Sequence, residues 1–525
     1  MERDTHMRTT PELTNSSSVL AEAIARLTDV LGADAVLLDE SQVKDFRDPY
    51  EGNNATDYQP AFVVQPSSVE EIQAVVRIAN ELQIQLWTSS TGRNYGYGGS
   101  APVVNGSVVL SLRRMNKILE INETAGYALL EPGVSFFDLY SEIKARGLKL
   151  WISVPDLGWG SIVGNTLDHG YGYTVNGDHA SAVCGMEVVL ASGEVVRTGL
   201  GAISNSPMWQ RHKRGFGPSL DSLFMQSNFG IVAKMGVWLM PEPEVFTTGA
   251  IICHNDEDIA PLIDALRPLV LDGTIQGLPL ITSSPEPEDG RANPMQDTAG
   301  MSKAAKLSAT LPPGRWHARI AFYGHDAVVA ARRRIVTDAV AHLPGVTVDL
   351  RSYRGDVGPE EVHPLDLVPA GIPNMFLLDM MKKHIGENVG HIDFSPAIPF
   401  DGESAAKHER MVRTVLEEAG LVAGFGWIAN TRSLVGACMV FFDVNDPAEA
   451  AAAHAAVELM CEKAAEWGWS EYRAHPSLIG HVAGNFDFND HALNRLYTSL
   501  KDALDPAGTL SPGNHGIWPS SAKNS

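Results

Sequence analysis

The sequence predicts an α+β fold of more than one packed unit, because short strands alternate with helices from residue 61 onward. The chain has 525 residues, and at about 100–200 residues per domain it is long enough for two or three units. Hydrophobic residues make up 44% of the chain and charged residues 20%. This composition excludes wholesale disorder and fibrous order.

The first strand and helix follow a polar leader. Residues 61–65, AFVVQ, are typical of a buried strand, and Ser68 and Glu71 have the spacing of a capping box that begins a helix. In that helix, apolar residues recur at i, i+3, i+4 and i+7, namely at Ile72, Val75, Val76 and Ala79. One face of the helix is therefore expected to pack on a sheet.

More strands and a helix follow before residue 200. Strands are predicted at 83–87, 107–112 and 127–133, and a helix is expected from Ser135 to Arg146, ended by Gly147. Residues 186–197, MEVVLASGEVVR, predict a strand, a Ser-Gly turn and a second strand.

A second unit is expected after Val237–Met240, where Pro241 and Pro243 interrupt the chain. Residues 281–314 are rich in Pro, Ser, Gly and charge without periodicity, which predicts a long exposed loop inside this unit. The Ala-rich run from Pro447 to Trp467 is expected to be helical by propensity.

Charge and cysteine content restrict the partners and the compartment. The formal net charge of −23 would repel phosphate backbones and anionic lipid surfaces, so nucleic acid and membrane are not expected as partners. The four cysteines are too far apart for a CxxC metal knuckle and too few for a disulfide framework. We therefore expect no metal site and a cytoplasmic location, and the N-terminus lacks the apolar run of a signal peptide.

The glycine-rich segment GYGGSA, from Gly96 to Ala101, has the GxGxxG/A spacing of a dinucleotide fingerprint. It leads into another strand and not into a helix, so a nicotinamide Rossmann site is rejected. The run from Thr91 to Gly99 could form an anion-binding nest or a plain tight loop. Together with glycine-rich segments at 155–173 and 226–239, it favours a wide cofactor held by backbone groups, unless the glycines merely turn the chain.

Longer motifs add a family resemblance. The motifs are TGRNYGYGG (91–99), LLEPGVSFFDLY (129–140), PDLGWGSIVGNTLD (155–168), GDH (177–179), GFGP (215–218), QSNFGIVAKMGVWLMP (226–241), GHIDFSP (390–396), EYRAH (471–475) and LDPAGTLSPGNHGIW (504–518). From about Asp48 to Trp518, the sequence resembles the flavoprotein family of vanillyl-alcohol oxidase and p-cresol methylhydroxylase, and it is most similar to bacterial eugenol oxidases.

This resemblance implies an FAD-binding domain of the p-cresol methylhydroxylase type with an inserted α+β cap domain. Mapped here, the FAD-binding domain would comprise 1–242 and the C-terminal return 470–525, with the substrate-binding cap at 243–469. The active site would lie where the two domains meet, and a homodimer is the expected assembly.

The implied activity is FAD-dependent oxidation of para-substituted phenols, with 4-alkyl, 4-allyl or 4-hydroxymethyl groups. Hydride would pass from the benzylic carbon to flavin N5 through a p-quinone methide, and O2 would be reduced to H2O2. Three alternatives stay open: a 4-alkylphenol dehydrogenase or hydroxylase that uses an electron carrier, a 2-hydroxy-acid or sugar oxidase on the same fold, and a non-catalytic binding protein.

The resemblance also assigns the reacting groups. His391 matches the histidine joined to the 8α carbon of FAD, and a neutral imidazole nitrogen is a suitable nucleophile. Tyr97, Tyr472 and Arg473 match the trio that binds the phenol as its phenolate. Asp156 matches the acid/base carboxylate beside flavin N5, with Tyr173 expected nearby as a further substrate contact.

The remaining matched positions would bind the cofactor. They are Ser90, Thr91, Gly92, Arg93 and Asn94 at the pyrophosphate, Ser161 and Asn165 along the flavin, and Ile231 and Val232 near the adenine or ribose.

Three positions depart from the eugenol oxidase pattern. Asp393 stands where relatives have glycine, so it could line the substrate cavity or point away and bind backbone. Asn514 stands where relatives have Lys or Arg, which puts one cofactor contact in doubt, and Tyr95 replaces a smaller or non-hydroxylated residue. The preferred phenol is therefore not carried over from the family.

Overall fold

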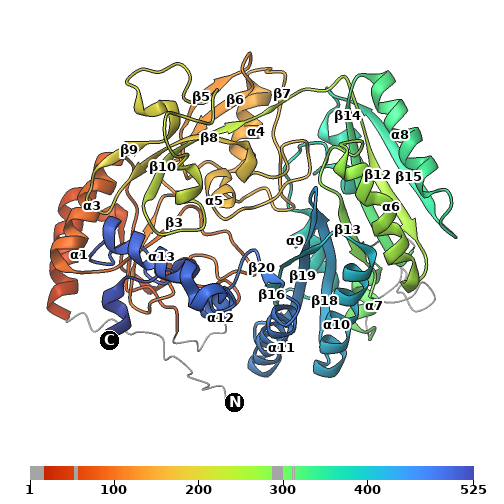
Figure 1. Ribbon diagram of the computed structural model, residues 1–525. Helices are drawn as coiled ribbons and strands as arrows, with labels where there is room; N and C mark the ends of the chain where they lie inside the picture. The colour runs from red at the N-terminus through yellow and green to blue at the C-terminus, as the bar shows by residue number, and fades with distance from the viewer. Residues whose placement is uncertain (1–16, 52–56, 286–299, 310, 312–313, 525) are drawn as a thin grey trace.

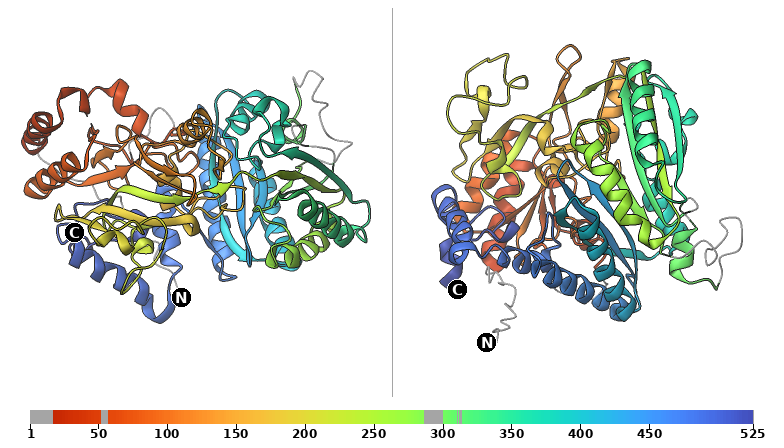
Figure 2. Two further views of the ribbon diagram at one scale, coloured as in Figure 1. Left: turned by 90° about the horizontal axis from the view of Figure 1, so that it is seen from above. Right: turned by 45° about the vertical axis from the view of Figure 1, so that its right-hand side comes forward.

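The structure is a computed structural model that describes residues 17–51, 57–285, 300–309, 311 and 314–524. Two halves lie side by side (Figures 1 and 2). The chain up to Pro241 builds one half around small sheets, and a nine-stranded sheet forms the other. Helices and sheets are mixed in both halves, which confirms the predicted α+β class.

A four-stranded sheet in the order β1-β2-β4-β3 begins the first half. Its strands are β1 (Val36–Leu37), β2 (Val63–Val64), β3 (Leu86–Ser89) and β4 (Val108–Ser111). Helix α3 (Val69–Leu82) packs beside it through the predicted apolar stripe, together with α1 (Ser17–Leu31). Helix α2 (Glu40–Val43) comes between β1 and β2 in the chain. Ser68 caps α3 as expected, but the Glu71 carboxylate accepts from the amide of Ser67 and not from that of Ser68, so the predicted box is not reciprocal.

A five-stranded antiparallel sheet in the order β5-β6-β10-β8-β9 follows. It consists of β5 (Ile118–Asn122), β6 (Tyr127–Leu130), β8 (Val183–Val189), β9 (Val195–Arg197) and β10 (Ile231–Trp238). Helix α4 (Phe136–Ala145) begins at the predicted cap Ser135, where Asp138 completes a true capping box. Helix α5 (Ile162–Leu167) and the short pair β7 (Leu150–Trp151) and β11 (Met240–Pro241) complete this region.

The nine-stranded sheet has the order β15-β12-β14-β13-β18-β19-β17-β20, with β16 also paired to β19. Its strands are β12 (Val245–Cys253), β13 (Leu280–Ser283), β14 (Trp316–Gly324), β15 (Thr347–Arg354), β16 (Val389–Phe394), β17 (Pro396–Pro399), β18 (Val422–Ala429), β19 (Ser433–Asp443) and β20 (Ser470–Glu471).

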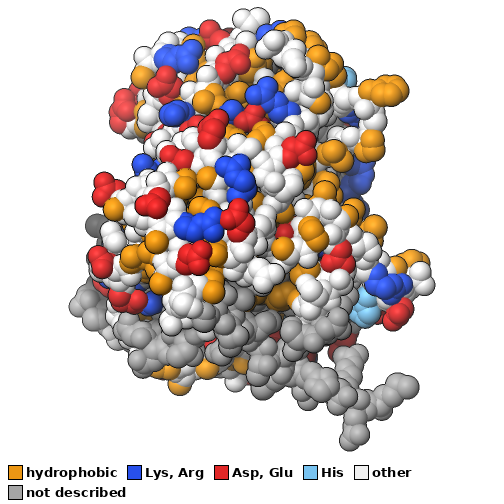
Figure 3. Space-filling view, turned by 90° about the vertical axis from the view of Figure 1, so that its left-hand side faces the viewer, with side chains coloured by type: hydrophobic (Ala, Val, Ile, Leu, Met, Phe, Trp, Pro, Cys, Tyr) orange, Lys and Arg blue, Asp and Glu red, His pale blue; other side chains and the backbone are white. Residues whose placement is uncertain are grey.

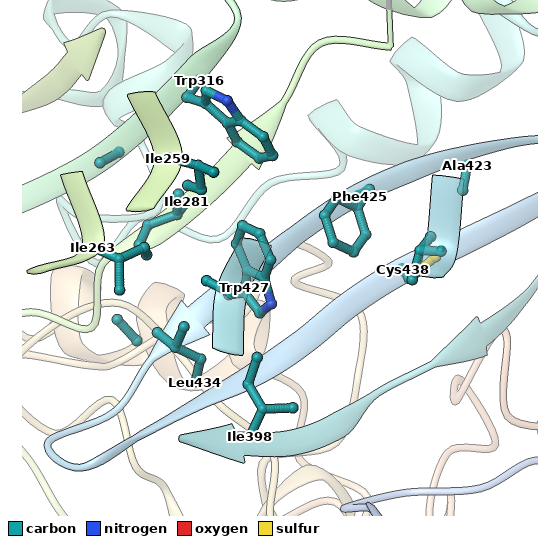
Figure 4. Close-up of a cluster of buried hydrophobic side chains, with 14 of the residues drawn as sticks. Ile259, Ile263, Ile281, Trp316, Ile398, Ala423, Phe425, Trp427, Leu434 and Cys438 are labelled. Atoms are coloured by element: carbon teal, nitrogen blue, oxygen red, sulfur yellow. The ribbon is translucent and has the colours of Figure 1, made fainter. Parts of the chain in front are cut away.

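One face of this sheet, here called the helix-covered face, packs against four long helices (Figure 1). They are α6 (Ile259–Leu271), α8 (Asp326–Val340), α10 (Gly402–Ala419) and α11 (Pro447–Ala465). Figure 4 shows the centre of this core, where Trp316 and Trp427 stack with ring centroids 5.7 Å apart. The opposite face, here called the cavity face, is turned toward the first half of the molecule.

The predictions for the Ala-rich run and for the loop at 281–314 had different outcomes. Helix α11 confirms the helix expected in the Ala-rich run. The loop expected at 281–314 is wrong at both ends, because β13 continues to Ser283 and α7 (Lys303–Ser308) forms with Ser302 as its cap. The middle of that predicted loop, 286–299, lies outside the described residues.

The chain enters β12 shortly after Pro241, and β20 pairs with β17 just before the chain returns to the first half. The domain boundaries at 242 and 469 stay predictions. Helices α12 (Ile479–Gly484) and α13 (Phe488–Leu504) then lie beside the first half (Figure 1). The return is tied there by a bridge between Leu86 and Leu510 and by the buried ammonium of Lys501, which donates to the Asn228 and Leu510 carbonyls.

The surface carries both signs of charge. On the face drawn in Figure 3, acidic and basic side chains of the described residues are interspersed with apolar ones. Across the stretches that the structure describes, none of the helices combines the length and the apolar character needed to cross a bilayer.

Candidate active site

A cavity of about 1200 Å³ lies between the two halves. Its walls come from stretches within 87–97, 155–173, 224–232 and 472–479, from the C-terminal segment 510–515, and from the cavity face of the large sheet. This volume exceeds the ~300–1,000 Å³ of most small-molecule sites. The cavity therefore has room for a dinucleotide cofactor together with a small aromatic substrate.

The loop after β3 forms one wall and brings five expected cofactor residues to the cavity. They are Ser90, Thr91, Gly92, Arg93 and Asn94. Gly92 has φ +67, and a Cβ there would lie 2.0 Å from Ser100 Oγ. A side chain at that position would clash with its neighbour, so the tight course of the loop requires glycine.

A second wall begins at helix α5. Ser161 caps this helix by accepting from the Gly164 amide, and its hydroxyl donates to the Pro132 carbonyl at 2.6 Å. A Cβ on Gly164 would lie 2.1 Å from Ser90 Oγ, so the two walls approach each other closely. Asn165, Ile231, Val232 and Asn514 also line the cavity. The backbone-rich character of these walls fits a cofactor held largely by main-chain groups.

Tyr97, Tyr472 and Arg473 meet at the end of the cavity next to the large sheet. The guanidinium carbon of Arg473 lies 5.7 Å from the Tyr97 ring and 5.3 Å from the Tyr472 ring. The two tyrosines are hydrogen-bonded to each other, and the Tyr97 hydroxyl lies 2.6 Å from Ser395 Oγ. Two hydroxyls and one guanidinium therefore converge, although 375 positions separate Tyr97 from Tyr472 (472 − 97) in the sequence.

The Arg473 side chain is held by backbone and carboxylate oxygens. It donates to the Asp168 carbonyl, to the Asn165 carbonyl at 3.1 Å and to Asn165 Oδ1 at 3.2 Å. The Asp168 carboxylate lies 3.3 Å from Arg473 Nε and accepts from Asn94 at 3.2 Å. Asp168 thus connects the expected cofactor loop to the expected substrate arginine.

Burial keeps the two tyrosines neutral, whereas charge interactions with neighbouring groups keep Arg473 charged. Burial raises the pKa of Tyr97 and Tyr472, and this effect outweighs the opposite pull of Arg473. For Arg473, burial by itself lowers the pKa. The charge interactions with Tyr472 and Asp168 act in the opposite direction and outweigh burial, so the net pKa is raised. The trio therefore presents two neutral O–H donors and one permanent cation to whatever occupies this end of the cavity.

Asp156 stands in the same cavity with Tyr173 and Arg319 as partners. The Tyr173 hydroxyl donates to Asp156 Oδ2 at 2.5 Å, as the expected proximity of these two residues requires. Arg319 Nη2 lies 3.5 Å from Asp156 Oδ1, and its guanidinium carbon lies 4.2 Å from the Tyr173 ring. Burial, followed by the charge of Asp156, raises the pKa of Tyr173, so this tyrosine remains a proton donor.

His391 and Asp393 lie on the cavity face of β16, where they form a buried pair. His391 Nδ1 is 2.7 Å from Asp393 Oδ1, and the two residues are 6% and 9% exposed. Of the two orientations considered for Asp393, the structure gives the one directed into the cavity. Tyr50 packs on the imidazole at 4.9 Å, and Tyr95 packs in turn on Tyr50 and Trp159.

Sequence reasoning missed Arg319, Ser395 and Asp168. The two-residue alternation of strand side chains is a signal for Arg319 and Ser395. Arg319 lies between the buried residues Ala318 and Ile320, so it points to the opposite face. Ser395 comes two residues after Asp393 and four after His391, so it points to the same face as they do. Asp168 carries no local signal, since its role depends on Arg473, which is remote in sequence.

Two family profiles and a characterised relative match this chain. The family profile described as "FAD binding domain" matches residues 60–199, and that described as "FAD linked oxidases, C-terminal domain" matches residues 380–515. The chain is 34% identical over 516 residues to the 4-cresol dehydrogenase [hydroxylating] flavoprotein subunit of Pseudomonas putida, covering 94% of this chain and 95% of that protein.

Two solved structures are similar throughout. The 4-ethylphenol oxidase from Gulosibacter chungangensis, in an isoeugenol complex, superposes with a TM-score of 0.89 at 34% identity and covers 98% of this chain and 100% of its own. The p-cresol methylhydroxylase with substrate bound gives a TM-score of 0.87 at 33% identity, covering 97% of this chain and 99% of its own.

Proposed function

Because the chain belongs to the vanillyl-alcohol oxidase and p-cresol methylhydroxylase family of flavin-dependent oxidoreductases, we propose that it is an oxidase of para-substituted phenols with 4-alkyl, 4-allyl or 4-hydroxymethyl groups. The observation that carries this proposal is the convergence of Tyr97, Tyr472 and Arg473 in a cavity that also receives Asp156. Similarity to flavoproteins named for 4-cresol and 4-ethylphenol supports the substrate class.

FAD is the cofactor of this family, and the glycine-bearing walls described above fit it. The loop Ser90–Asn94 would hold the pyrophosphate, Ser161 and Asn165 would lie along the flavin, and Ile231 and Val232 would contact the adenine or ribose. His391 would carry the covalent link to the 8α carbon. When bound, FAD supplies a hydride acceptor at N5 and passes the electrons to O2, which gives H2O2.

The trio would bind the substrate as its phenolate. The neutral hydroxyls of Tyr97 and Tyr472 donate to the phenolic oxygen, and Arg473 supplies the compensating positive charge. A bound phenolate releases hydride from its benzylic carbon more readily than a phenol, because the electron pair on oxygen moves into the ring as a p-quinone methide forms.

Asp156 would then act as a base in the step that consumes the quinone methide. Its carboxylate can take a proton from a water molecule that attacks the quinone methide, or from the substrate side chain itself. The hydrogen bond from Tyr173 and the charge of Arg319 orient the carboxylate for this role. Tyr173 lines the cavity and would border the para substituent of the substrate.

A dehydrogenase that passes electrons to a protein carrier is the second candidate. It shares every residue role above, and the 34% identity to a 4-cresol dehydrogenase flavoprotein subunit favours it. The two candidates differ in the oxidant alone, so peroxide formation under air separates them.

The test is a substrate screen in two steps. Anaerobic mixing with vanillyl alcohol, eugenol and 4-ethylphenol should bleach the flavin absorbance with at least one phenol, and failure with all three refutes the phenol assignment. Aerobic turnover should then give one peroxide per substrate oxidised; bleaching without peroxide selects the dehydrogenase. A homodimer is the proposed assembly, and light scattering on the purified protein checks it.

A further inference from the structure

We propose that Asp393 is a positioning residue for flavin attachment: it holds the Nδ1 proton of His391, so that Nε2 is the nitrogen that bonds to the 8α carbon of FAD. The inference deepens the proposed function, since it rests on His391 as the attachment point.

The first support is the geometry of the pair. His391 Nδ1 and Asp393 Oδ1 are 2.7 Å apart, and both side chains are more than nine-tenths buried. They occupy alternate positions of β16 and therefore project to the same face of the sheet, into the cavity. Among the described residues, the imidazole makes this one side-chain hydrogen bond, and Nε2 has no hydrogen-bond partner there.

The second support is the close packing of the loop after β3 against the His391–Asp393 pair. Gly96 has φ +83, and a Cβ at this position would lie 2.6 Å from Asp393 Oδ2 and 2.6 Å from His391 Nδ1. The Asp393 amide donates to the Gly96 carbonyl at 3.3 Å. The Gly96 backbone therefore lies against the Nδ1–Cε1 edge of the imidazole and against the Asp393 carboxylate.

The chemistry requires this arrangement. A neutral imidazole has one nucleophilic nitrogen, and its identity depends on which nitrogen holds the proton. A carboxylate that accepts from Nδ1–H fixes the tautomer with Nε2 free, and it stabilises the positive charge that grows on the ring as Nε2 forms a bond. Asp393 would supply both effects through its hydrogen bond to His391.

The step balances with O2 as oxidant. The Nε2–C8α bond forms, and the 8α methyl group loses one hydrogen as a proton. Two electrons pass to the flavin ring, and O2 then removes them as H2O2 together with that proton and the imidazole proton. The product is the oxidised, histidyl-linked flavin.

The experiment measures attachment and not turnover. Apoprotein of the full chain is mixed with FAD in air, samples are acid-denatured over time, and the flavin that stays with the protein is quantified by mass and fluorescence. Wild-type protein should become fully flavinylated. Asp393→Asn should bind FAD with unchanged affinity but attach it about 10²-fold more slowly, because the uncharged amide no longer stabilises the growing positive charge.

Two further variants separate positioning from structure. Asp393→Glu restores the charge on a longer side chain and should attach flavin faster than Asp393→Asn. Ser395→Ala is the matched control, since Ser395 is the next buried polar residue on the same face and contacts Tyr97 instead of His391; it should attach flavin at the wild-type rate.

Equal attachment rates in wild type and Asp393→Asn would overturn the role of Asp393, as would an Asp393→Glu variant no faster than Asp393→Asn. If Asp393→Asn fails to fold, Asp393→Ala, which also removes the carboxylate, takes its place: slow attachment in that variant supports the proposal, and a wild-type rate overturns it. Wild-type protein that releases all its flavin on denaturation would instead refute the link at His391, while oxidation of phenols by dissociable FAD would remain measurable.

Discussion

The two faces of the nine-stranded sheet both carry buried side chains but differ chemically. On β16, Ile392 and Phe394 face the covering helices and are 1% and 0% exposed, whereas His391 and Asp393 face the cavity at 6% and 9%. On β14, Trp316 and Ala318 alternate in the same way with His317 and Arg319. Burial alone therefore does not distinguish a core from a site, and the distinction lies in which polar groups the buried positions carry.

This comparison separates two kinds of mutational effect. Changes on the helix-covered face should alter the free energy of unfolding and leave the flavin chemistry intact. Changes on the cavity face should do the reverse, because their partners are the cofactor and substrate. Four predictions test the separation, from the largest effect to the smallest.

Trp427→Ala should cost about 3–5 kcal/mol of unfolding free energy, since it empties a fully buried site between Trp316 and Phe425. Denaturant unfolding of the flavin-loaded protein measures the loss. At temperatures where the variant is folded, its rate of flavin reduction by 4-ethylphenol should match wild type. A stable variant with slow reduction would mean that the two faces are coupled.

Tyr472→Phe should lower kcat/KM for phenols by about 10²-fold, because one donor to the phenolate is lost. The free energy of unfolding should change little, as only a cavity-facing oxygen is removed. Tyr127→Phe is the matched control, since Tyr127 hydrogen-bonds to Glu120 in the five-stranded sheet, away from the cavity. Unchanged turnover in Tyr472→Phe would favour a hydroxy-acid or sugar oxidase.

The helix-covered face should make stability sensitive to acid through His408. Burial lowers the pKa of His408 to about 3, and its Nδ1 accepts from Trp427 Nε1 at 2.9 Å. In the unfolded chain a histidine has a pKa of about 6.5, so the stabilisation is present above that pH and is lost as the pH falls toward 3. At about pH 5 the loss is about 2 kcal/mol.

His408→Gln should accordingly lose less stability than wild type between about pH 7.5 and about pH 5. Urea unfolding of both proteins at the two pH values gives the difference, and contributions from other histidines cancel in the comparison. An identical pH dependence in the two proteins would exclude His408 as the source.

Ser395→Ala should have the smallest effect. It removes the partner of the Tyr97 hydroxyl, 2.6 Å away, which corresponds to about 1 kcal/mol or a several-fold fall in kcat/KM. Steady-state turnover with 4-ethylphenol measures it, and Ser181→Ala on the exposed loop after Asp178 serves as a control. A loss above 10²-fold would show that Ser395 contacts the substrate directly.

Local patterning predicted the first half of the fold well. The apolar stripe of α3, the cap at Ser135 and the strand-turn-strand of 186–197 all depend on neighbours in sequence, and the structure has them. The start of the loop predicted at 281–314 was wrong because β13 is stabilised by pairing with β14 and β18, which no local signal encodes. The fold class and the family were available from long motifs.

The sequence predicted which residues line the candidate site, but not most of the contacts between them. Motif matching identified Asp156, Tyr173, His391 and the trio, and the proximity of Tyr173 to Asp156 was expected. The roles of these residues stay predictions. Arg319 and Asp168 could not be found in this way, because each acts through a residue that only folding brings close.

The return of the C-terminus to the first half has a consequence for biosynthesis. Leu510 bridges to β3, Lys501 is buried against the Asn228 carbonyl, and Tyr472, Arg473 and residues 510–515 complete the cavity. Residues 472–515 leave the ribosome after the parts of the first half that they contact. The cavity therefore cannot close until these residues have been synthesised, and a chain truncated before about residue 470 lacks two of the three residues of the proposed phenolate site. We therefore expect cofactor loading to follow the synthesis of residues 472–515.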